Sequence, residues 1–174
     1  WNATTGEYLT GEAAIAAMPN ATDDFLKYDS TTKVMNVNGE LRINGSLAFT
    51  TYGKQDTVNY SGRVVLLVDG AVTLNANLLA CNSGNPGNIT SSFPEANILC
   101  IMASGEILLN SYSMVPVIMG VLYSESMIKF TKHTSILGAV AANYFDCGTQ
   151  VPVVYHVPAI TEHLPPGMIG EYFP

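Results

Sequence analysis

The sequence predicts an all-β fold: a parallel β-solenoid (β-helix-like) with a short N-terminal helix and a proline-rich C-terminal strap. Two observations predict it. A nine-residue pattern recurs along the chain, and the 174 residues are apolar and charge-poor, with 48% hydrophobic and 12% charged residues. That composition excludes a disordered chain and allows one sizeable core. We therefore predict a single domain over 1–174, with an N-terminal cap or extension at 1–32, the solenoid at 33–150 and the strap at 151–174.

The recurrent pattern consists of a short strand, a small polar pair and a second strand with apolar residues at alternate positions. The four windows, aligned without gaps, are 35–43, 66–74, 101–109 and 122–130. Their fifth residues are Gly39, Gly70, Gly105 and Ser126. One such window alone is typical of a tight hairpin. Because the same corner recurs between the same kinds of strand, the set favours stacked coils of a parallel solenoid.

The second strand of each window should point its alternating apolar side chains into the solenoid. These side chains are Leu41, Ile43, Val72, Leu74, Ile107, Leu109, Ile128 and Phe130. The apolar stretch 134–142 predicts a further interior strand. Uneven spacing between windows predicts loop insertions, chiefly at 51–60 and 81–94, where Gly, Asn, Ser and Thr are frequent.

The two ends differ from the repeat. Residues 10–18 form an Ala-rich run that stops before Pro19, which predicts a short helix, and 23–28 favours a further helical turn. A helix there would cover the open edge of the first coil. The proline-rich tail from Val151 predicts an extended strap without regular structure. Since the chain opens at Trp1 and not at Met, we expect a processed or excised piece.

Charge and hydropathy exclude two classes of partner. The seven basic residues are scattered and the net charge is −7, so the chain lacks the basic stripe that a nucleic acid requires. Apolar runs such as 64–68 and 116–123 are far shorter than the ~20 residues needed to cross a bilayer. We expect neither nucleic-acid binding nor a direct membrane span.

Residues that carry chemistry are sparse, and we expect no enzyme activity, no catalytic residues, no cofactor and no bound metal. The histidines (His133, His156 and His163) stand alone. Glu40 and Glu106 occupy equivalent window positions and would stack along one edge, as a cation or sugar site or, more simply, as a solvated corner.

Cysteines and asparagines supply the remaining site predictions. Three cysteines without a CxxC spacing argue against zinc. Cys100 has a core-strand context, so if a disulfide forms we expect it between Cys81 and Cys147. Glycosylation sequons, or simply turn asparagines followed by small polar residues, begin at Asn2, Asn20, Asn44, Asn59 and Asn88.

The order of these pieces resembles a known family. The succession 62–74, 97–109, 118–123 and 136–145, followed by 151–158 and the Leu-Pro-Pro ending at 164–166, is similar to the C-terminal β-solenoid domain of PilX-type minor pilins and related type IV pilus assembly proteins. The resemblance covers roughly 33–168 and has no catalytic residues to transfer. It implies a non-catalytic role in a pilus or another extracellular filament. The long apolar N-terminal helix of a type IV pilin is not found in this sequence.

Two functions follow as expectations. The first is a structural subunit of an extracellular filament or pilus, located outside the cell or at its surface, whose partners are copies of itself or other pilin subunits. The alternative is an adhesin-like binding module that recognises glycan or a surface through its loops.

Overall fold

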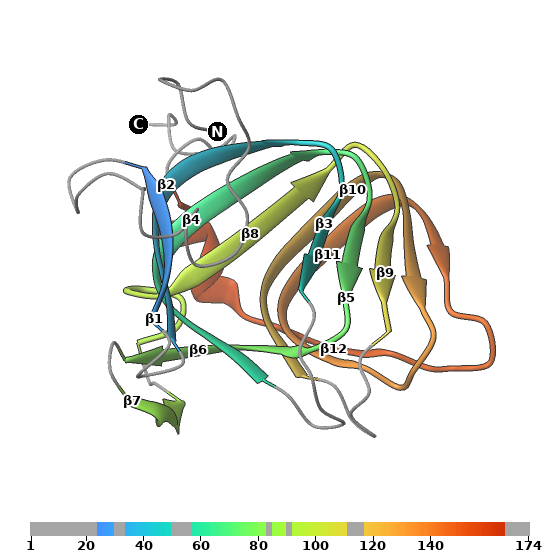
Figure 1. The fold of residues 1–174 in the computed structure, drawn as a ribbon. Coiled ribbons are helices and arrows are strands. Elements are labelled where there is room, and N and C mark those ends of the chain that lie inside the picture. Colours follow the sequence, from blue (N-terminus) through green and yellow to red (C-terminus); the bar gives the residue numbers. More distant parts are fainter. Residues whose placement is uncertain are drawn as a thin grey trace.

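The protein is described here from a computed structural model, which describes residues 24–29, 34–49, 57–82, 85–89, 92–110 and 117–165. Within these ranges the chain is almost entirely strand (Figure 1). The elements in chain order are β1 (Phe25–Asp29), β2 (Val34–Asn44), β3 (Leu47–Phe49), β4 (Thr57–Asp69), β5 (Val72–Leu74), β6 (Asn77–Asn82), β7 (Asn85–Ile89), β8 (Ile98–Ala103), β9 (Ile107–Leu109), β10 (Val117–Phe130), β11 (Ser135–Asp146), β12 (Val153–His156) and the 3-10 helix η1 (Pro158–Glu162).

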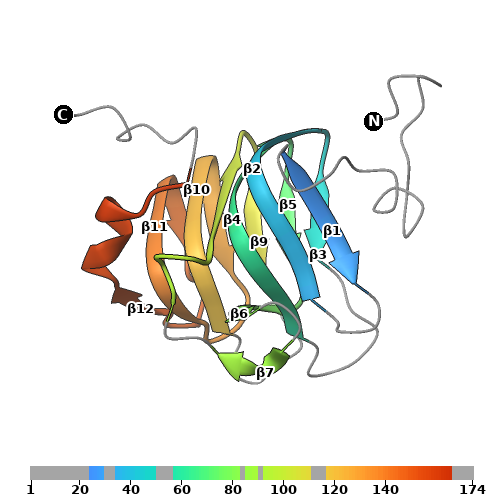
Figure 2. The same cartoon turned by 90° about the vertical axis from the view of Figure 1, so that its left-hand side faces the viewer.

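These strands form a parallel β-solenoid of about 5 turns, as the sequence predicts. Each coil has three faces. The first face contains β6, β12 and the starts of β4, β10 and β11. The second contains β2, β8 and the middle of β4, β10 and β11. The third contains β3, β5, β9 and the ends of β10 and β11. Figure 2 shows the coils side by side, with β1 at one end and β12 and η1 at the other.

Three of the four recurrent windows stack in the predicted register. Leu66 pairs with Ile101, which pairs with Leu122, and Ile107 lies between Val72 and Ile128. The predicted position of the first window, 35–43, is wrong by six residues. Leu41, not Met35, pairs with Leu66, so the equivalent segment is 41–49.

Two Asn-Gly pairs in the first coil explain that error. Asn44-Gly45 forms the corner between β2 and β3, whereas Asn38-Gly39 lies inside β2. Gly39 has φ +80°, a backbone conformation that L side chains rarely adopt, so glycine is favoured there by the conformation of the strand and not by a corner. Local sequence does not distinguish the two positions, because both follow a polar residue and precede alternating apolar residues.

The corner between the second and third faces is a ladder of glycines. A Cβ on Gly70 would lie 2.8 Å from the carbonyl carbon of Gly45, and one on Gly105 would lie 2.9 Å from that of Gly70. Backbone therefore packs directly on backbone at this corner. In the next coil, Ser126 takes the equivalent position, and the hydroxyl of Ser124 bridges the corner, donating to Gly105 O (2.7 Å) and accepting from Ser126 N (3.0 Å).

The interior is filled by ladders of apolar side chains. Six of the predicted core residues are buried, namely Val72, Leu74, Ile107, Leu109, Ile128 and Phe130. Leu41 and Ile43 are only partly buried but pack against the same cluster. They belong to the first coil that the structure describes. Tyr60 is fully buried inside the coil, and its hydroxyl donates to Met119 O (2.9 Å).

The start of the described chain is a strand and not a helical turn. The prediction of a helical turn at 23–28 is wrong for its described part, because β1 pairs antiparallel with β2 from Phe25↔Asn38 to Asp29↔Val34. Leu26 and Tyr28, two residues apart, both pack on the core, which is strand periodicity. β1 thereby covers part of the edge of the first coil. The helix predicted at 10–18 lies outside the described residues.

The strap is more regular than predicted, and the solenoid extends beyond residue 150. β12 pairs in parallel with the start of β11, from Ser135↔Val153 to Gly138↔His156. The tail then forms η1, whose Ile160 is buried. The prolines Pro152 and Pro158 lie on either side of β12 and not within it, so they remove no backbone N–H from the strand.

The predicted interior strand is confirmed in outline, whereas the predicted insertions fall only partly within the described residues. Residues 134–142 fall largely in β11, which lies parallel beside β10 as a further coil. In the insertion predicted at 51–60, residues 57–60 are strand (β4), and 51–56 lie outside the described part. The insertion at 81–94 begins later, since Cys81 lies in β6, and includes β7, which turns back antiparallel on β6.

Candidate functional site: an outer groove and an exposed coil end

A groove of about 320 Å³ crosses four coils on the outer side of the second face. Two register rows line it. The inner row runs across the strands in the order Arg42, Leu67, Met102 and Tyr123. The corner row, next to the glycine ladder, is Asn44, Asp69, Ser104 and Glu125. Below, "the groove" means these eight side chains.

The inner row is apolar over three coils and the corner row is polar over four. Leu67, Met102 and Tyr123 are partly buried, whereas all four side chains of the corner row are exposed. The Ser104 hydroxyl donates to Asp69 Oδ1 (3.3 Å), which links two adjacent coils. Asn143 of β11 donates to Glu125 O. The groove thus combines an apolar floor with a rim of hydroxyl, amide and carboxylate groups.

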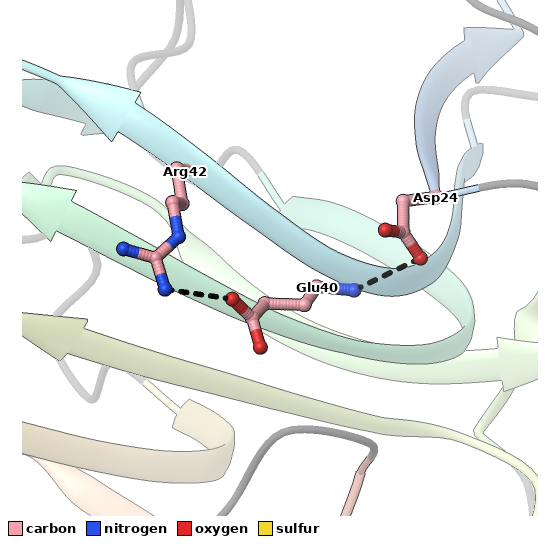
Figure 3. A network of polar contacts seen from close by, with 3 residues as sticks. All are labelled: Asp24, Glu40 and Arg42. Atoms are coloured by element: carbon pink, nitrogen blue, oxygen red, sulfur yellow. Dashed lines mark hydrogen bonds and ion pairs between the residues drawn. The ribbon is translucent and has the colours of Figure 1, made fainter.

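The first-coil end of the groove is set by a small polar network (Figure 3). Arg42 Nη2 lies 3.2 Å from Glu40 Oε1, and the backbone N–H of Glu40 donates to Asp24 Oδ1 at 3.3 Å. The side chain of Arg42 is 77% exposed, so this ion pair is weak. Glu40 nevertheless offsets the positive charge of Arg42, while no ion pair joins Asp69 or Glu125 to a cation within the described ranges. The groove is therefore net acidic.

The C-terminal tail covers the row beside the groove. Val65, Cys100 and Val121 point outward on one register row, yet they are buried because Ile160 packs on them. The guanidinium of Arg63 fastens this cover, donating from Nη2 to Leu164 O (2.7 Å) and from Nη1 to Glu95 O (3.0 Å). No residue of the described part of the tail, 151–165, lines the groove.

The predicted pairing of Glu40 with Glu106 is wrong. It depended on the first window, which is displaced by six residues. Glu40 pairs with Val65 inside β2 and β4, whereas Glu106 follows the Gly105 corner in the third coil. The two carboxylates therefore do not stack along one edge, and the acidic side chains that share an edge are Asp69 and Glu125.

No disulfide joins Cys81, Cys100 and Cys147, all of which lie in the described part of the chain. Cys81 lies buried in β6, not in a polar loop, and Cys100 is buried in β8 as expected. Burial raises the pKa of Cys100 to about 12 and also raises the pKa of Cys81. Both thiols are therefore protonated at neutral pH and poor nucleophiles. The Cys81–Cys147 disulfide is not formed here and stays a prediction for oxidising conditions.

The sequons are placed unequally. Asn44 is exposed at the end of β2. Asn59 is buried in β4 (8% exposed), and its Oδ1 has no hydrogen-bond partner among the described residues, so this position does not accommodate a glycan in the folded chain. Asn88 lies in β7, and Asn2 and Asn20 lie outside the described residues.

The last coils carry an exposed apolar patch, which we call the coil-end patch. All large hydrophobic side chains that are exposed in the described part of the chain lie here: Tyr144, Phe145, Val151, Val154 and Tyr155. Tyr144 is 63% exposed and Tyr155 is 57% exposed. Among the described strands, only β12 pairs with the far edge of β11, and it does so only over Ser135–Gly138. Along residues 139–146, no described strand pairs with that edge.

No family model, no curated protein and no solved structure matches this chain. Within the described ranges, no group of three or more His, Cys, Asp or Glu side chains is arranged to hold a metal ion. Nor does any helix there have the length and apolarity to cross a membrane.

Proposed function

We propose that this protein is a structural subunit of an extracellular filament or pilus, and that subunits contact one another through the coil-end patch. The observation that carries the proposal is the confinement of all large exposed hydrophobics of the described chain to one end of the solenoid. Exposed apolar side chains gathered in this way mark an interaction surface.

The backbone at the same end supports this proposal. A solenoid coil satisfies its strand groups only through the coils on either side, so a terminal coil has one unsatisfied edge. At the opposite end β1 covers the edge of β2 over Val34–Asn38. At the coil-end patch, residues 139–146 of β11 have no described strand on the side away from β10. A neighbouring subunit that adds a strand there would gain both hydrogen bonds and apolar burial.

Filament growth requires two different surfaces on each subunit. A contact between unlike surfaces gives an open filament when the rotation between neighbouring subunits does not close into a ring. The coil-end patch is one surface, and the outer edges of β1 and β3, on which no other described strand pairs, supply the second. The extracellular and pilus-associated parts of the proposal rest on the resemblance over residues 33–168.

The test compares the parent protein with a Tyr144→Asp/Tyr155→Asp variant by sedimentation and electron microscopy at high concentration. We expect filaments or a ladder of oligomers from the parent, and monomers with an unchanged melting temperature from the variant. The matched control is Tyr123→Ala, which changes a tyrosine of the groove that is not part of the patch and should assemble like the parent. A parent that stays monomeric at the highest soluble concentration would overturn the proposal.

A second candidate is a glycan-binding, adhesin-like module, and the groove is the observation that favours it. Its residues lie on a sheet face and not in loops, unlike the sequence-based expectation. Monomeric protein with specific hits on a glycan array would favour this candidate over the filament subunit.

A further inference from the structure

We propose that the groove binds a linear, uncharged oligosaccharide that lies along the solenoid axis, across the strands. The four coils that line the groove are hydrogen-bonded neighbours, and adjacent strands lie about 4.8 Å apart. Three such intervals give a groove roughly 14 Å long, of which the apolar floor from Leu67 to Tyr123 takes two, and this length is comparable to a short oligosaccharide. This inference does not depend on the proposed filament role.

The two rows match the two kinds of surface on a sugar chain. A pyranose ring presents an apolar C–H face and a rim of hydroxyl groups. The ring of Tyr123 and the side chains of Leu67 and Met102 supply an apolar floor for the former. The corner row supplies acceptors at Asp69 and Glu125 and mixed donors and acceptors at Asn44 and Ser104, which suit hydroxyl groups. Mostly apolar sites with a few converging polar groups are typical of small-ligand binding.

The charge of the groove discriminates between neutral and anionic sugars. Asp69 and Glu125 lie on the rim without a cationic partner in the described chain, and Arg42 is offset by Glu40. Uronic or sialylated glycans would place a carboxylate beside these two carboxylates, which is unfavourable. An uncharged glycan is therefore favoured over an anionic one. The same repulsion argues against a nucleic acid.

Backbone pairing argues against a peptide strand in the groove. Peptides add to a sheet at an open edge, where backbone groups are unpaired. In the groove, β4 pairs with β2 on one side and with β8 on the other, so its backbone groups are already used. Only side chains face the ligand.

The groove is also held rigid before any ligand binds. Its side chains project from paired strands, and the Ser104–Asp69 hydrogen bond fixes the carboxylate across two coils. The covered row beside it, with Cys100 and Ile160, backs Leu67 and Met102 from the side of the tail. A rigid site loses less conformational entropy on binding, which favours affinity.

The test uses an array of neutral, amino-bearing, uronic and sialylated oligosaccharides, followed by calorimetry with cellotetraose, chitotetraose and tetragalacturonate as soluble probes. We expect hits among neutral glycans, at least a tenfold loss of affinity in Tyr123→Ala, and near-parental affinity in Tyr123→Phe, which keeps the ring. Asp69→Asn should weaken binding and relax the discrimination against acidic glycans. Tyr144→Ala, which removes an exposed tyrosine from the coil-end patch, is the matched control and should bind like the parent.

Several results would overturn this inference. They are the absence of any hit on the array, a preference for acidic glycans, or equal affinity in parent and Tyr123→Ala. Binding that requires Ca²⁺ and is abolished by a chelator would make Asp69 and Glu125 a cation site instead. Circular dichroism of each variant confirms that a loss of binding does not reflect unfolding.

Discussion

Replacing Gly105 by alanine tests the glycine ladder that sets the corner of the first three described coils. The new Cβ would lie 2.9 Å from Gly70 C and 3.0 Å from both Ala71 N and Gly70 O, where ordinary contacts are 3.4–4 Å. Every one of these atoms is backbone, so no side chain can rotate away. The coils must separate by about half an ångström at this corner, a movement that strains a packed interior.

Two opposing effects decide the size of the change. Overpacking of this kind destabilises by about 1–3 kcal/mol. The gain from reducing the freedom of the unfolded chain on Gly→Ala is about 0.4–1 kcal/mol. Gly105, unlike Gly45, has no positive φ, so alanine adds no separate backbone strain there. Separation also stretches the bonds from Gly105 N to Gly70 O (3.0 Å) and from Val72 N to Glu106 O (2.8 Å). We expect a net loss of about 1–2 kcal/mol.

Urea unfolding followed by circular dichroism measures this loss as a lower midpoint with an unchanged slope. The matched control is Ser104→Ala, which changes the preceding, exposed residue and should stay within about 0.5 kcal/mol of the parent. If Gly105→Ala is as stable as the parent, the corner opens freely and the close-packing argument is wrong.

Three further predictions follow from the core, the buried thiol and the tail. Ile107→Asp places a charge in a fully buried ladder of side chains and should prevent folding. A soluble variant with the parental melting temperature would contradict the assignment of Ile107 to the core. Because burial raises the pKa of Cys100 to about 12, the folded chain keeps a proton that the unfolded chain loses near pH 9. The free energy of unfolding should therefore fall by up to about 1.4 kcal/mol per pH unit between these values, and more slowly in Cys100→Ala, when measured by urea titration. Arg63→Ala removes the hydrogen bonds to Leu164 O and Glu95 O, so the thiol of Cys100 should react faster with Ellman's reagent. The control variant Arg42→Ala should react at the parental rate. Equal rates in Arg63→Ala and the parent would show that the cover formed by the tail does not depend on Arg63.

Several features of the fold could be read from local pattern. Alternating apolar residues around a polar-Gly corner recur at 66–74 and 101–109, and this recurrence was enough to predict parallel stacking and the burial of Val72 and Ile107. Such patterns are informative because the two-residue period and the conformational freedom of glycine act within a few residues of chain.

Register and the candidate sites were decided only by the tertiary structure. Asn38-Gly39 and Asn44-Gly45 look alike locally, and only packing of the first coil on Leu66 selects the second as the corner. Tail residues 153–156 become a strand only because β11 offers them an edge. The groove brings together residues from 42 to 125 in the chain, and their adjacency depends on loop lengths that set the register of each coil. Loop length carries no periodic signal of its own, so the sequence predicted the coils, and the stacked structure determined which side chains meet on their surface.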